Sequence, residues 1–98
     1  MKYIILFEDN SSVSPDIRKK HMPEHLAFLE ENANIIDAAG PLHDLTGKGA
    51  GGIWIVDTDS EEKVEQLIHD DPFWPTGLRK SYRILKWTRV FENGLRRI

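Results

Sequence analysis

Two residues whose side chains could together carry out proton transfer, a histidine and an aspartate, occur within or at the end of predicted helices in this sequence. His25 lies inside a helical pattern directly before Leu26, and Asp71 stands where a second helical pattern stops before Pro72. Histidine exchanges protons close to neutral pH and therefore suits general acid–base catalysis. The helix dipole disfavours an acid at a helix C-terminus, so Asp71 needs a local reason to stand there. We interpret His25 and Asp71 as a candidate catalytic pair.

In this pair, His25 would be the general base or acid. Asp71 would accept the other N–H of its ring and thereby select one tautomer. Both residues also have structural interpretations: His25 as a boundary residue that bonds a backbone carbonyl, and Asp71 as a cap of the Asp-Pro turn. Sequence spacing does not set their separation. A distance beyond about 4 Å with no bridging water would favour binding or structure over acid–base work.

The second histidine of the same segment raises the question of a metal site. His21 and His25 are spaced i, i+4 and would share one helix face. A zinc site needs a third ligand, which no local motif supplies, and HMPEH is not the HExxH pattern. Cysteine is absent, which removes thiol catalysis and cysteine-based zinc sites. We therefore expect no metal and no cofactor, and a solvated surface position for His21.

Glycines and aromatic residues provide candidate surroundings for a pocket. Gly40-Pro41 and the glycine-rich stretch Gly47 to Gly52 lack the phosphate-loop spacing, so they predict a hairpin connection. Gly40 and Pro41 are candidates for a backbone edge of the pocket. Aromatic side chains more often build a core or an interface than a ligand platform. Those that could form apolar pocket walls are Trp54, Phe73 and Trp74.

Apolar patterning and turn residues predict the elements that would position these groups. Ser14 and Pro15 start a short helical turn over residues 15–20, and Pro23 then begins the main helix, which runs to about Asn34. A second helix opens at residues 59–62, ends at Asp71-Pro72 and buries Val64, Leu67 and Ile68. The predicted buried face of the first helix is formed by Met22, Leu26, Leu29 and Ala33. The predicted strands cover residues 3–7, 35–39 (ended by Gly40-Pro41), 53–56 and 82–90.

The predicted order of strand, helix, strand, strand, helix, strand is that of the ferredoxin-like fold, an α+β architecture. Its four-stranded antiparallel sheet carries two helices on one face and leaves the other face bare. Residues 3–7 and 53–56 are apolar on both faces, and soluble monomers rarely expose a large apolar patch. We therefore predict a homodimer that packs sheet against sheet, which would form a dimeric α/β barrel.

Composition limits the remaining classes of function. The chain has 98 residues and a net charge of −3, so it fits a single domain over residues 1–98, with residues 92–98 as a tail, and has no basic field for nucleic acid. No apolar run is long enough to span a membrane, and the apolar run near the N-terminus is too short for a signal peptide. We expect a cytoplasmic protein.

Several segments in order resemble the YCII-related family. They are His25 to Leu29, Ala39 to Leu42, Gly51 to Ile53, Asp71 to Phe73 with Gly77, and Ile84 to Trp87. The resemblance covers Tyr3 to Phe91 and implies a ferredoxin-like subunit, a dimeric α/β barrel and a His/Asp site in a cleft. The family's histidine falls on His25 and its aspartate on Asp71. One branch of the family resembles a dehydrochlorinase of a chlorinated hydroxyquinol.

These observations together predict a small-molecule enzyme that transfers protons without a cofactor, as a lyase, isomerase or dehydrochlorinase-like protein. Its substrate is not defined by the sequence. The alternative is a binding or regulatory module that holds a small ligand, or a partner protein, in the same dimeric barrel without chemistry. The loop that carries His43 and Asp44 is expected to border the cleft.

Overall fold

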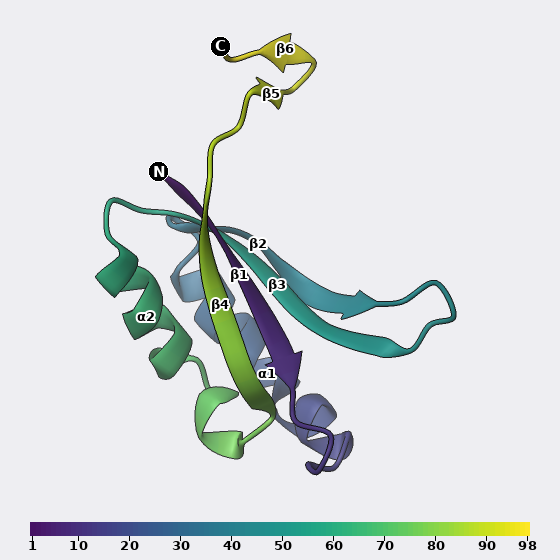
Figure 1. Cartoon of the computed structure of the whole chain (residues 1–98). Helices are drawn as coiled ribbons and strands as arrows, with labels where there is room; N and C mark the ends of the chain where they lie inside the picture. The colour runs from purple at the N-terminus through teal and green to yellow at the C-terminus, as the bar shows by residue number, and fades with distance from the viewer.

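The structure, a computed structural model, describes residues 1–98 as a four-stranded antiparallel sheet with both long helices on one face (Figure 1). The strands lie in the order β2-β3-β1-β4, which together with the element order defines the predicted ferredoxin-like fold. No helix is long and apolar enough to cross a membrane. The elements are β1 (Lys2–Asp9), α1 (Asp16–Glu31), β2 (Ile36–His43), β3 (Gly49–Asp57), α2 (Glu61–Asp70), the 3-10 turn η1 (Trp74–Thr76), β4 (Arg79–Trp87), β5 (Phe91–Glu92) and β6 (Leu95–Arg96).

The first helix is continuous, so the predicted break into a short turn and a main helix is wrong. Pro23 lies inside α1, where its ring removes one backbone hydrogen bond. The helix continues because His25 and Phe28, beyond the proline, are buried against the sheet. The helix starts one residue later than predicted, with Pro15 instead of Ser14 at the N-cap position, although the Ser14 hydroxyl accepts a hydrogen bond from the Asp16 N–H at 3.2 Å. At the other end Asn32 caps the helix by donating to the Phe28 carbonyl.

The buried face of α1 is also rotated from the predicted one. His25 and Phe28 are buried, whereas Leu26 is half exposed and Ala33 lies beyond the helix end. Apolar spacing alone favoured the leucines over a histidine. The histidine is buried because a carboxylate in the interior satisfies its ring, as described below.

The stretch around Gly40 is strand rather than turn. β2 continues through Gly40 and Pro41 to His43, and β3 begins at Gly49, so the predicted end of the strand at Gly40-Pro41 is wrong. Pro41 is tolerated because β2 is an edge strand of the sheet, where a missing N–H leaves no neighbour unpaired. The β2–β3 hairpin bends away from the rest of the sheet (Figure 1).

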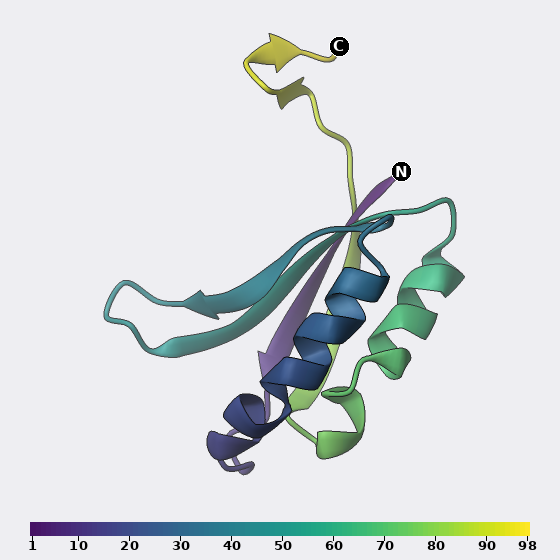
Figure 2. The same ribbon diagram turned by 180° about the vertical axis from the view of Figure 1, so that it is seen from behind.

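The second helix agrees with its prediction. The Ser60 hydroxyl accepts from the Lys63 N–H at 3.3 Å, which caps the N-terminus of α2. α1 and α2 lie side by side over the sheet (Figure 2). Between helices and sheet lies the core, to which α2 contributes Val64, Leu67 and Ile68 and the sheet contributes Tyr3, Ile5, Phe7, Trp54 and Val56.

The last strand begins earlier than predicted, at Arg79 instead of Tyr82, and ends at Trp87. The chain beyond it forms the short hairpin β5–β6, which projects away from the body of the molecule (Figure 1). Arg79 at the start of β4 pairs with Asp9 at the end of β1. This pairing brings both residues to the site described below.

The second face of the sheet, which we call the open face, carries no helix (Figure 1). Cross-strand register places its residues together: Ile4 is paired with Ile55 and Leu85, and Leu6 is paired with Ile53. These side chains are half-buried or exposed in the single chain. The sheet is therefore apolar on both faces, as the strand patterns indicated.

Candidate active site

Asp71 is the buried centre of the site. It directly follows α2, and its side chain is 0% exposed. Three donors saturate the carboxylate: the His25 Nδ1 at 2.9 Å and the Phe73 N–H at 3.0 Å reach Oδ1, and the Arg79 Nη1 reaches Oδ2 at 2.6 Å. The Asp-Pro sequence thus ends the helix with a local turn that also anchors two side chains from other elements.

The Oδ1 atom of Asp71 makes both predicted contacts, because it accepts from the Phe73 N–H of the turn and bonds the His25 ring. Burial alone would raise the pKa of Asp71. The hydrogen bond from His25, the charge of Arg79 and the Phe73 N–H together hold that pKa below its ordinary value. The carboxylate is therefore ionised near neutral pH and acts only as an acceptor.

His25 is oriented from two sides. Its ring stacks on Phe73 with centroids 4.3 Å apart, and its Nδ1 bonds Asp71. Because the ionised carboxylate can only accept, Nδ1 carries the proton and the neutral ring keeps its lone pair on Nε2. Nε2 makes no hydrogen bond to the protein and is not sealed from solvent, since the one buried unpaired side-chain atom is the His21 Nδ1.

Arg79 completes the network from β4. Its side chain is 6% exposed, and its guanidinium lies over the Phe7 ring at 3.9 Å and 5.2 Å from the Trp54 ring. Burial lowers the pKa of Arg79, while the nearby charge of Asp71 opposes that shift. An arginine remains charged even so, and the ion pair with Asp71 stabilises it in the interior. A cation–π contact with Phe7 adds to this stabilisation.

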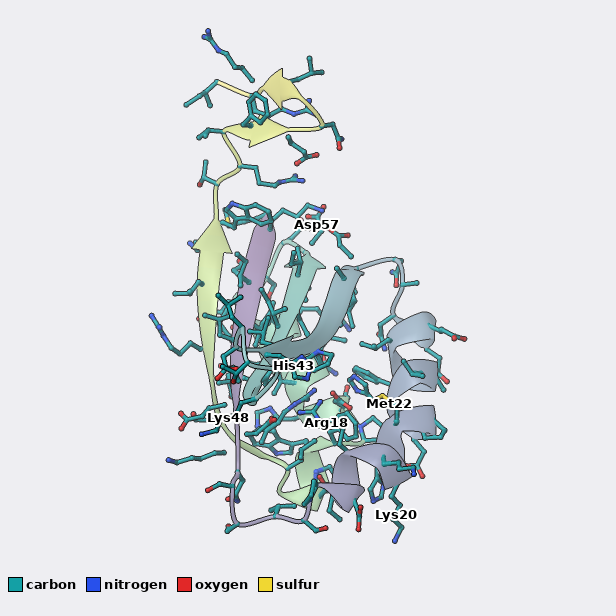
Figure 3. The ribbon with its side chains drawn as sticks, turned by 90° about the vertical axis from the view of Figure 1, so that its right-hand side faces the viewer. Arg18, Lys20, Met22, His43, Lys48 and Asp57 are labelled. Atoms are coloured by element: carbon teal, nitrogen blue, oxygen red, sulfur yellow. The ribbon has the colours of Figure 1, made fainter.

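A cavity of about 100 Å³ opens beside this network. It lies between α1 and strands β1 to β3, and its rim carries an ion pair between the Arg18 Nη2 and the Asp9 Oδ2 at 2.7 Å. Figure 3 shows Arg18 and Met22 on the side of α1 that faces the sheet, whereas Lys20 points away. The lining residues are Phe7, Asp9, Arg18, Met22, His25, Leu26, Leu29, Ala39, Gly40, Pro41, Gly52, Ile53, Trp54 and Arg79.

Of the residues predicted from sequence to bind substrate, three lie in the cavity wall and two do not. Gly40, Pro41 and Trp54 line it. Phe73 is fully buried and supports the His25 ring instead of facing the cavity. Trp74 packs against His69 and Tyr82, away from the cavity. Phe73 and Trp74 therefore serve the packing around the site.

The hairpin residues expected to border the cleft lie outside its lining. The cavity wall ends at Pro41 on β2 and at Gly52 on β3, so His43 and Asp44 do not reach it. Asp44 instead closes the hairpin by accepting from the Thr46 and Lys48 N–H groups. The Thr46 hydroxyl also donates to Asp44, and this hydrogen bond, followed by those from the backbone, lowers the pKa of Asp44.

Sequence reasoning missed the two arginines and Asp9. The last strand was predicted to begin at Tyr82, three residues after Arg79, so the pairing of Arg79 with Asp9 was not predicted. No sequence pattern signalled this pairing, because it depends on the register of β1 with β4, which brings an acid and a base together at one sheet end. No group of three or more metal-ligating side chains comes together in the structure. His21 is only partly exposed, so the solvated surface position predicted for it is correct only in part: its Nδ1 is buried without a hydrogen bond and lies 3.7 Å from a Glu24 carboxylate oxygen.

The ferredoxin-like fold with a buried His–Asp pair at a cavity defines a class of small α+β proteins with a candidate acid–base site. Within that class, the chain belongs to the YCII-related domain family, whose model matches residues 1–88. No curated protein sequence matches the chain.

Two solved structures show what the chain is similar to. The 5-chloro-2-hydroxyhydroquinone dehydrochlorinase TftG from Burkholderia phenoliruptrix AC1100, in complex with 2,5-dihydroxybenzoquinone, is 25% identical with a TM-score of 0.78; the match covers 90% of this chain and 94% of that one. The solution structure of the Arabidopsis thaliana protein At3g17210 is 15% identical with a TM-score of 0.53, over 90% of this chain and 86% of that one. The second likeness concerns the fold alone.

Proposed function

We propose that this protein is a cofactor-independent small-molecule enzyme, a lyase or isomerase, in which His25 takes a proton from the substrate. The observation that carries the proposal is the 2.9 Å contact of the His25 Nδ1 with buried Asp71, which leaves Nε2 unpaired beside the cavity. A general base needs this arrangement of an oriented ring and a free nitrogen within reach of substrate. Substrate binding would involve Gly40, Pro41 and Trp54 in the cavity wall.

The reaction step follows from the tautomer. The Nε2 lone pair takes a proton from a substrate O–H or C–H bond, and the electrons of that bond remain on the substrate. Asp71 stabilises the imidazolium that forms, because its negative charge lies against Nδ1. The imidazolium then returns the proton to another substrate atom, for an isomerase, or to water after a leaving group has departed, for a lyase.

The structural likeness to TftG supports elimination from a hydroxylated ring as the first reaction to test. The purified protein would be incubated with 5-chloro-2-hydroxyhydroquinone and with other phenolic and lactone-like compounds, with chloride release and ultraviolet spectra as readouts. His25→Ala should abolish turnover of any substrate found. His43→Ala, which changes an exposed histidine outside the cavity, is the matched control.

Undiminished turnover by folded His25→Ala protein would refute the role of His25. The alternative function, a binding or regulatory module, predicts ligand binding without turnover in every variant. It also predicts that Asp71→Ala weakens binding or stability with no catalytic effect. The short His25–Asp71 contact favours the enzyme, because a pure binding site does not require an oriented base.

We also propose that a second copy of the chain covers the open face. The apolar side chains of the open face, which the single chain leaves partly uncovered, are Ile4, Leu6, Ile53, Ile55 and Leu85, with Arg83 opposite Leu6 on the edge strand β4. Packing two such faces together would remove this surface from water and add a core that 98 residues cannot bury alone. The resulting dimer would be the α/β barrel that the sequence predicted.

A further inference from the structure

The Arg79 guanidinium has donors that the protein itself does not use. One nitrogen, Nη1, is bonded to Asp71, and the remaining N–H groups on Nε and Nη2 have no protein partner. These atoms are not sealed in the interior, because the His21 Nδ1 is the one buried side-chain polar atom without a partner. Arg79 lines the cavity. The Arg79 side chain is only 6% exposed and keeps unpaired donors next to a cavity, which indicates that a ligand in the cavity supplies a hydrogen-bond acceptor.

One carboxylate holds Arg79 and His25 together. Asp71 binds the histidine through Oδ1 and the arginine through Oδ2, so the free Nε2 and the free guanidinium donors belong to adjacent groups on one rigid support. The aromatic rings of Phe73 under His25 and of Phe7 under Arg79 restrict both groups further. A base and a cationic donor at neighbouring positions suit a ligand whose oxygen gains negative charge when a proton leaves.

We infer that Arg79 binds an oxyanion of the ligand, and that the cavity takes a planar molecule carrying an acidic oxygen, such as a phenolate, enolate or carboxylate. The inference rests on the proposed function and names the substrate class of the same site. Phe7 and Trp54 contribute to the apolar part of the cavity lining. The cavity of about 100 Å³ is smaller than the roughly 150 Å³ cavity that encloses benzene, so a substituted ring would be held in part and would extend through the opening.

The other charges around the cavity do not replace Arg79 in this role. Arg18 is paired with Asp9 at the rim, where both side chains are about one-third exposed. Solvent screens such a pair, so it contributes little to holding an anion. Asp71 is fully occupied by its three donors and is buried behind His25 and Arg79. Arg79 is therefore the most buried cationic side chain in the cavity lining and lies beside the His25 ring.

Calorimetric titration with two pairs of matched ring compounds tests the inference. Benzoate against benzamide and 4-nitrophenolate against 4-nitroaniline differ mainly in the charge on one substituent. The wild-type chain should prefer the anionic member of at least one pair, and the pair that shows it distinguishes a carboxylate from a phenolate ligand. This comparison needs no variant. Equal binding of both members in both pairs, or no binding of either anion, would overturn the inference.

Variants then assign the preference to a residue. Arg79→Lys keeps a cation for Asp71 but loses the extra donors, so affinity for the preferred anion should fall about 10- to 100-fold while the neutral member is unaffected. Lys80→Gln removes a positive charge from the neighbouring exposed position and should change nothing. Wild-type affinity of folded Arg79→Lys protein for the anion would also overturn the inference. His25→Gln should still bind the anion, so loss of turnover in that variant reports on the base and not on Arg79.

Discussion

Neutralising Asp71 is the perturbation for which the structure gives the clearest magnitude. Asp71→Asn preserves the shape of the side chain but removes the negative charge and turns one acceptor into a donor that faces Arg79 or His25. Arg79 would then be a buried cation without its counterion, since its side chain is only 6% exposed. Breaking a buried pair from one side costs about 3–5 kcal/mol.

This cost is a large part of the total for a chain of this size, because small domains are stable by only about 5–15 kcal/mol. Urea and thermal unfolding of Asp71→Asn should therefore show a loss of about 3–5 kcal/mol and a melting temperature lower by more than about 10 °C. Asp70→Asn is the matched control: it changes an exposed neighbour at the helix end and should cost nothing.

The pH dependence of this difference is an independent check. The pKa of folded Asp71 is depressed, so its contribution is fully present above the ordinary value of about 3.9 and is lost as pH falls below it. The difference in the free energy of unfolding between wild type and Asp71→Asn should become smaller as pH falls below about 4. The reasoning is refuted if Asp71→Asn unfolds within 1 kcal/mol of Asp70→Asn at neutral pH.

Three further predictions concern other parts of the chain. Gly51→Ala should severely destabilise the protein in urea unfolding, because φ at this position is +90° and the new Cβ would lie 1.9 Å from the Phe7 carbonyl oxygen. Gly49→Ala is the control, since its Cβ would have no atom within 4 Å. Equal stability of the two variants would contradict this prediction. The pKa of Tyr82 is raised to about 12, mainly by its hydrogen bond to Glu65 and further by burial. Spectroscopic titration should therefore find a tyrosine that ionises near pH 12 and that is absent from Tyr82→Phe. The hydrogen bond stabilises the fold below pH 10, and this stabilisation is lost as pH rises through 12. Sedimentation at micromolar concentration should give twice the 11.3 kDa chain mass, and Leu85→Lys on the open face should give the single mass; a wild-type monomer would contradict the dimer.

The parts of the fold that follow local rules were predictable from sequence. Ser60 and the acids after it started α2 where expected, and its buried residues followed the apolar spacing. Errors occurred where a tertiary contact outweighed a local preference. α1 continues through Pro23 because residues beyond it pack on the sheet, and β2 continues through Pro41 because an edge strand tolerates a missing donor.

The sequence by itself determined the order of the four sheet strands and two helices, the apolar character of both sheet faces and the choice of His25 and Asp71 as candidates, whereas the β5–β6 hairpin was expected only as a tail. These properties depend on residue type and on spacing along the chain. Only the tertiary structure decided that the two side chains touch, that Arg79 joins them and that Phe73 supports the site from below instead of lining it. The physical reason is that these contacts join α1, the turn after α2 and the start of β4. Their distances depend on how helices pack on a sheet and on strand register, which local patterns do not specify.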